Sequence, residues 1–105
     1  MSRPVATTGK DPPLEVTEAD TVAAAVLGCA GVARMHAGGI PPVATYLPGR
    51  RVAGVRLTDS AIEVAVVARP GVRVPTLDTE VRAALAPLAR GRAVDVHVAD
   101  IDMEG

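Results

Sequence analysis

The amino-acid sequence predicts an α+β domain, a two-layer sandwich in which a small mixed or antiparallel sheet of three to five strands carries two helices on one face. Two segments have apolar residues at helical spacing, and much of the chain outside them alternates between apolar and polar residues as strands do. Their order along the chain is helix, three or four strands, helix, strand. With this order, both helices can cover the same face of one sheet.

A chain of 105 residues is expected to form one domain. Residues 1–16 mix Pro, Gly and Thr with little apolar periodicity, so we expect a flexible leader there. Residues 17–101 then form the domain, and residues 102–105 form an acidic tail. Hydrophobic residues make up 49% of the chain but include a single aromatic residue, Tyr46. The core must therefore be built from Val, Ala, Leu and Ile, and we expect its stability to be modest.

Thr17 is expected to begin the first helix, because Asp20 stands three residues later as in a capping box. Either Gly28 or Gly31 can end this helix, the second as a left-handed cap. Cys29 lies among small apolar residues, which indicates a buried thiol, and as the only cysteine it excludes an internal disulfide or a cysteine zinc site. The predicted buried face of the helix consists of Val22, Ala25, Val26 and Cys29.

Four stretches after this helix have strand character. Two of them flank Pro48-Gly49, a pair that fits the centre of a type II turn. The most regular alternation precedes Pro70, which ends that strand because proline cannot donate a ladder hydrogen bond. The expected strands cover residues 31–36, 43–46, 52–57 and 61–68.

The second helix is predicted to run from Thr76, its cap, to Gly91, with Pro87 kinking or shortening the last turn. Asp78 and Arg82 form a favourable i,i+4 pair on it. The core face of this helix is expected to consist of Leu77, Val81, Ala84, Leu85 and Leu88.

Residues 94–101 are predicted to form the last strand, with valines on one face and Asp95 and His97 on the other. His36 and His97 lack partners at metal-ligand spacing, so solvated strand positions explain both, and we expect no metal site. Ser60 has no convergent His and acid, so nucleophilic catalysis has no support.

Two short motifs resemble ion-binding loops and are set aside. TTGKD at 7–11 lacks the first glycine and the Ser or Thr of a phosphate-binding loop. DIDME at 100–104 has alternating acids, but it lacks the turn glycine and the distal glutamate that a calcium loop needs. We therefore expect no cofactor and no catalytic residue.

The net charge of −1 argues against a dedicated nucleic-acid binder. Residues 22–101 carry nine Arg against six acids, a charge of +3, and this mildly basic body is compatible with an anionic partner. The chain start lacks the apolar region of a signal peptide, and the longest apolar run, residues 22–33, is too short to span a bilayer. We therefore expect a cytoplasmic protein whose membrane contact is peripheral or made through a partner.

Tyr46, Arg50, Arg51 and Arg56 form the most specific group of polar residues, around the Pro-Gly turn. Arginine can bind a carboxylate or phosphate through two N–H groups, and an aromatic ring can stack on a base or lie on a lipid headgroup. The alternative is a solvated turn whose arginines reflect a codon bias, since the chain has ten Arg to one Lys. We take these four residues as candidates for contact with a partner or an anion.

VATYLPGRRVAGVRL at 43–57, with the following IEVAVVARPGVRVP, TLDTEVRAALAPL and VDVHVADI, resembles the bacterial alkaline shock protein family of envelope stress response proteins. The resemblance covers residues 22–101 and is most specific in the block ATYLPGRRV-GVR, which is similar to actinobacterial members. It implies a small α/β domain without catalytic residues, which gathers at the cytoplasmic face of the membrane by binding a small membrane-anchored protein; members of the family often self-associate. The resemblance therefore implies a role in cell-envelope homeostasis.

Two positions depart from the family pattern. Pro70 stands where members often carry an aromatic residue, which implies a shortened or bulged strand edge, and Asp59-Ser60 replaces an Asp-Gly type of turn. The rival hypothesis is a single-stranded nucleic-acid or ribosome-associated binding module, because small α/β domains with basic loops have such roles. The missing aromatic platform and the near-neutral charge argue against it.

Overall fold

The computed structural model describes residues 16–36, 38 and 42–101, so the expected leader and acidic tail, with the motif at 7–11, lie almost wholly outside the described residues. Within this part no helix is long and apolar enough to cross a membrane. The described residues form two helices and six strands, which follow one another as α1 (Glu18–Leu27), β1 (Val32–Met35), β2 (Ala44–Leu47), β3 (Arg50–Ala53), β4 (Val55–Leu57), β5 (Ala61–Ala68), α2 (Val74–Ala89) and β6 (Ala93–Ile101).

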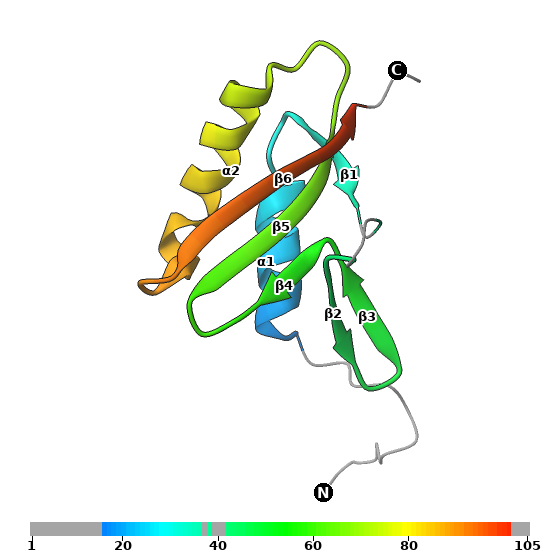
Figure 1. Ribbon diagram of the computed structural model, residues 1–105, viewed down its shortest axis with the longest axis vertical. Helices are drawn as coiled ribbons and strands as arrows, with labels where there is room; N and C mark the ends of the chain where they lie inside the picture. The colour runs from blue at the N-terminus through cyan, green and yellow to red at the C-terminus, as the bar shows by residue number, and fades with distance from the viewer. Residues whose placement is uncertain (1–15, 37, 39–41, 102–105) are drawn as a thin grey trace, which may run out of the picture.

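The main sheet is built around β5 (Figure 1). β6 runs parallel to β5 along its whole length, and this fills one edge of β5. The other edge is shared by β4, which pairs antiparallel with its first half, and β1, which pairs antiparallel with its second half. β2 and β3 form a separate antiparallel hairpin. The sheet is therefore mixed, which is one of the two arrangements that the sequence prediction leaves open.

The hydrophobic core lies between the main sheet and the two helices, which occupy the same face of the sheet (Figure 1). Alternate residues of β5 point into it, and the most buried side chains of each helix meet them there. The predicted α+β sandwich is thus confirmed. The core side chains with 0% exposure are Val22, Val26, Val55, Ile62, Val64, Val66, Leu77, Val81 and Leu85, together with the small residue Ala68.

Gly54 breaks the strand predicted over residues 52–57 into β3 and β4. Its φ of +77° is left-handed, and this turns its carbonyl toward the amide of Ala65 on β5 while its own N–H donates to Val43. A Cβ at this position would lie 2.7 Å from the Ala65 carbonyl oxygen, so the close approach also requires glycine. This break separates the β2–β3 hairpin from the main sheet.

The helix ends differ from the sequence prediction in two places. α2 begins at Val74 with Arg73 as its N-cap, not at Thr76, because Pro75 fits the first turn with its fixed φ and missing N–H. It continues through Pro87 and ends where Arg90 adopts a left-handed φ of 52°. α1 ends at Leu27 with Gly28, the first of the two expected positions, as its C-cap, and this cap is right-handed. The predicted capping box of Thr17 and Asp20 is confirmed.

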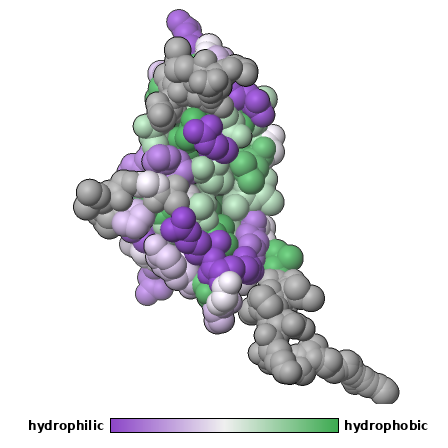
Figure 2. Space-filling model, turned by 90° about the vertical axis from the view of Figure 1, so that its right-hand side faces the viewer, coloured by the Kyte–Doolittle hydropathy of each residue, from purple (hydrophilic) through white to green (hydrophobic). Residues whose placement is uncertain are grey.

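The side of the molecule that carries β1 and the hairpin has an uneven surface (Figure 2). Apolar residues gather across its middle, with strongly hydrophilic residues above and below them. The exposed large apolar residues include Tyr46, at 66%, on the hairpin. Arg50 and Arg51 lie on the same hairpin, and Arg56 lies on the following strand β4. This side of the molecule therefore contains the first candidate site.

Candidate functional site

The β2–β3 hairpin is tight and has a fixed register. Leu47 pairs with Arg50 across the two-residue turn Pro48-Gly49, and Gly49 has the positive φ, 78°, of the third position in a type II turn. The turn therefore determines which side chains lie on each face of the hairpin. Thr45 and Val52 face the body of the molecule, and the Thr45 hydroxyl donates to the Val55 carbonyl at 2.6 Å.

Arg50 ties this hairpin to the start of α1. Its Nη1 and Nη2 donate to Oδ1 and Oδ2 of Asp20 at 2.9 and 2.8 Å, a two-point contact that matches the planar guanidinium to the carboxylate. The same carboxylate accepts from the backbone N–H and the hydroxyl of Thr17, both at 2.8 Å. Arg50, and with it the two Thr17 donors, lowers the pKa of Asp20 well below its usual value. Arg50 thus contributes to the assembly of the domain.

Arg56 is also held within the domain, on β4. Its Nη2 donates to Glu63, its cross-strand partner on β5, at 2.7 Å, and its Nη1 donates to the Pro42 carbonyl at 3.2 Å. The ion pair raises the pKa of Arg56. This pair lies on the main sheet and is structurally separate from the hairpin turn.

Tyr46 and Arg51 are direct cross-strand partners on the outer face of the hairpin. Both side chains are exposed, and the Arg51 side chain makes no hydrogen bond or ion pair with another residue in the described part of the chain. The four candidate residues therefore occupy three places. Only Tyr46 and Arg51 form a pair that is open to another molecule.

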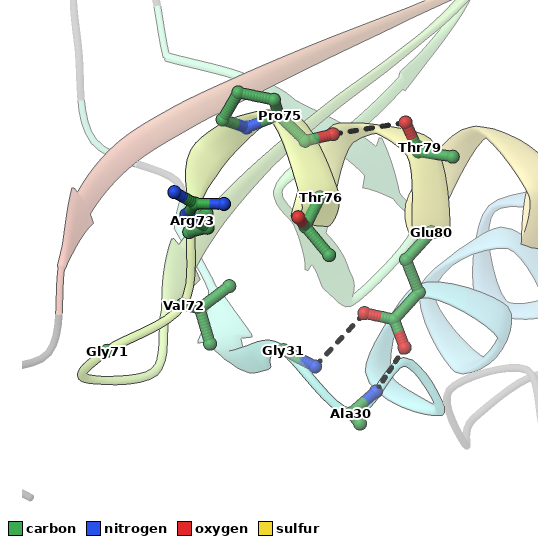
Figure 3. A pocket seen from close by; sticks show the side chains of 9 residues that line it. All are labelled: Ala30, Gly31, Gly71, Val72, Arg73, Pro75, Thr76, Thr79 and Glu80. Carbon is green, nitrogen blue, oxygen red and sulfur yellow. Dashed lines mark hydrogen bonds between the residues drawn. The ribbon is translucent and has the colours of Figure 1, made fainter.

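A second feature is an open cleft of about 890 Å³ beside the start of α2, between the α1–β1 turn and residues 71–73 (Figure 3). Glu80 of α2 closes one side, because its carboxylate accepts the backbone N–H of Ala30 at 2.7 Å and that of Gly31 at 3.2 Å. A Cβ at Gly31 would crowd Glu80 and Leu77 at 3.1–3.2 Å, so glycine permits this approach. Val72 and Pro75 add apolar walls.

Two of the polar side chains that line this cleft, Thr79 and Glu80, are engaged within the protein. Thr79 donates its hydroxyl to the Pro75 carbonyl at 3.1 Å, and Glu80 is occupied by the two amides (Figure 3). Cys29, behind the same turn, is 6% exposed, as expected for a packed thiol, and its sulfur contacts the Glu80 carbonyl oxygen at 3.8 Å. These polar contacts therefore stabilise the protein itself. Sequence reasoning missed Glu80, whose partners lie about 50 positions away in the chain.

His36 and His97 lie on the side of the main sheet that the helices leave open. They line one cleft of about 430 Å³, although 61 positions separate them in the sequence. In the sequence, His36 ends one predicted strand and His97 lies inside another, and nothing in the pattern indicates that the two residues are close. Among the described residues, no three His, Cys, Asp or Glu side chains are grouped so that they could hold a metal ion.

No protein-family model, no curated protein and no solved structure matches the chain.

Proposed function

We propose that this chain is a non-enzymatic interaction module of the cell-envelope stress response, which acts at the inner face of the membrane by binding a small membrane-anchored protein. The family resemblance over residues 22–101 suggests this role. The observation that supports it best in the structure is the exposed Tyr46–Arg51 pair, since it lies within the block of strongest resemblance and is left open by the fold.

The pair has the chemistry of a contact site for a protein. Tyrosine offers a large rigid surface with a polar end, and arginine offers a fork of donors for a carboxylate, and both residue types are enriched where interfaces are tightest. The hairpin is held in place by Arg50 and Asp20, so the pair is presented from a fixed support. An acidic or amide-rich segment of the membrane-anchored partner, close to an anionic lipid surface, fits this charge.

The experiment is membrane fractionation of the tagged protein from its source cells, with wild type and the double variant Tyr46→Ala/Arg51→Glu. We expect the wild type to sediment with membranes together with a small transmembrane protein, and the variant to remain in the supernatant. Arg69→Glu is the matched control, because it reverses one exposed charge away from the hairpin and is expected to sediment like the wild type.

Two results would contradict the proposal. One is equal sedimentation of the double variant and the control. The other is recovery of the wild type with RNA or ribosomes in a complex that dissociates steeply as salt rises, which is the behaviour of phosphate binding. Arg50 is left unchanged in this design, because Arg50→Glu would place a second carboxylate against Asp20 and disturb the fold itself.

A further inference from the structure

The open face of the main sheet brings both histidines of the chain around one small residue, Ala65. Alternate residues of β5 point into the core, so Glu63 and Ala65 point to the opposite, helix-free face. His97 is the partner of Ala65 on β6, and on the other side the backbone N–H of His36 donates to the Ala65 carbonyl at 2.9 Å. The two histidines therefore flank Ala65 on its two sides. Two steps of the usual spacing between neighbouring strands place their Cα atoms about 10 Å apart.

The cleft over Ala65 has a small, apolar floor and a polar rim. Ala65 and Ala99 leave room above the sheet, and His36, His97, Arg56 and Glu63 stand around the volume of about 430 Å³. The ring of His36 is packed closely on its neighbour, since a Cβ on Gly38 would lie 2.7 Å from Nε2. His36 is thus half-buried and positioned, and His97 is exposed beside the opening.

The charge of this cleft depends on the histidines. Arg56 and Glu63 neutralise one another at 2.7 Å, although the two described bonds of Arg56 use only two of its five N–H groups. On either side of Ala65 along β5, the register places Arg34 beside Val67 and Asp95 beside Glu63. The positive charge of Arg34 and the negative charge of Asp95 balance one another.

Asp100 follows on β6 at the register position of Val67. Imidazole gains its proton in mildly acidic solution, so acidification adds up to two positive charges around Ala65.

We propose that this cleft binds a small oxyanion, a carboxylate or a phosphate, over Ala65 between His36 and His97, and that binding strengthens on acidification. Two protonated imidazoles and the remaining N–H groups of Arg56 provide donors from both sides of the cleft, and charge-assisted bonds of this kind are the stronger ones. This site is independent of the Tyr46–Arg51 pair, and its test does not depend on the proposed function.

The test follows the imidazole resonances of the full chain by NMR during pH titrations in chloride, acetate and inorganic phosphate at equal ionic strength. An anion that binds the charged histidines raises their titration midpoints, because it stabilises the protonated form. We expect an upward shift for both histidines with at least one of the two oxyanions. We also expect binding that is about tenfold tighter in mildly acidic than in neutral solution, as one gained charge-assisted bond provides.

His97→Gln and His36→Gln are the test variants, and Arg73→Gln, a cation outside the cleft, is the matched control. Each histidine variant should remove most of the shift at the remaining histidine, and the control should keep it. Because His97 is exposed, His97→Gln keeps the test valid if His36→Gln disturbs its packing on Gly38. The proposal is overturned if neither oxyanion moves the midpoints, or if Arg73→Gln reduces the shift as much as His97→Gln does. A shift with acetate alone or with phosphate alone identifies which oxyanion the cleft accepts.

Discussion

The Asp20 carboxylate accepts both Nη groups of Arg50 at 2.9 and 2.8 Å, although it also closes the capping box of α1. One side chain therefore satisfies the first turn of a helix and holds a hairpin 30 positions away. The hairpin belongs to a separate two-stranded sheet, so this contact substitutes for the ladder hydrogen bonds that it lacks to the main sheet.

Asp20→Asn should lower the free energy of unfolding near neutral pH and flatten its dependence on acidity. Arg50 holds the pKa of Asp20 below its unfolded value of about 3.9. A carboxyl whose pKa is depressed by folding adds stability above the unfolded pKa, and this stability is lost as pH falls toward the folded pKa. Urea unfolding followed by circular dichroism between about pH 7 and pH 3 measures this slope. Asp59→Asn, in an exposed turn, is the control, and equal slopes for both variants would refute the assignment.

The capping box of Asp20 can be predicted from the sequence, but its contact with Arg50 cannot. Thr17 and Asp20 are three positions apart, so local hydrogen-bonding rules predict the cap. The Arg50 partner depends on how the hairpin folds back, which periodicity does not encode. For the same reason, the turn and register of the hairpin could be predicted from Pro48-Gly49, but the assignment of Arg50 to the fold and of Arg51 to solvent could not.

Gly54→Ala should be one of the most destabilising single-methyl changes in the protein. The residue needs a φ of +77°, and the new Cβ would lie 2.7 Å from the Ala65 carbonyl oxygen and 2.9 Å from the Met35 Cβ. We expect a loss of about 2 kcal/mol or more in the free energy of unfolding, measured by urea denaturation. Gly91→Ala is the matched control.

Gly91 has a φ of +83°, but no atom lies within 4 Å of the position that a new methyl group would take. Only the backbone cost of about 1 kcal/mol therefore applies to Gly91→Ala. A Gly54→Ala variant no less stable than Gly91→Ala would show that the β3–β4 break tolerates a side chain. In the sequence, a glycine inside a strand pattern is a known sign of a bulge or close approach, and this sign was available at Gly54.

Glu80→Ala should destabilise the protein by about 1–3 kcal/mol, because the Ala30 and Gly31 amides both lose their acceptor. Chemical denaturation gives the change in unfolding free energy, and amide hydrogen exchange at Ala30 and Gly31 should accelerate. Asp78→Ala, on the same helix, removes an exposed i,i+4 ion pair with Arg82 and should cost at most about 0.5 kcal/mol. If the two variants were equally stable, the Glu80 contacts would contribute little.

The helix faces were predictable and the contacts made at their ends were not. The spacing of Leu77, Val81 and Leu85 identifies the buried face of α2, and all three are fully buried. Glu80, one position from that face, looks like an ordinary surface acid in the sequence. Its role follows from the turn after α1, which only the packed structure brings within reach.

Cys29 should react slowly with a thiol-specific reagent in the native protein and quickly in denaturant. Burial is the main cause that raises the pKa of its thiol, with a smaller contribution from the negative charge of Glu80, so less of the reactive thiolate forms near neutral pH. Cys29 as a whole is only 6% exposed, so the reagent also reaches its side chain poorly. We expect native labelling to be slower than that of the unfolded chain by about tenfold or more, because the buried thiol is both less ionised and less accessible.

A time course of labelling, followed by mass spectrometry, measures this ratio, and Glu80→Ala provides the informative comparison. That variant frees the turn beside Cys29 and removes the nearby charge, so its native labelling should be faster than that of the wild type. Asp78→Ala leaves the turn intact and should label at the wild-type rate. Native labelling as fast as that of the unfolded chain would mean that the turn at residues 28–31 opens freely, and the packing of α1 against α2 at Cys29 would then be looser than the structure indicates.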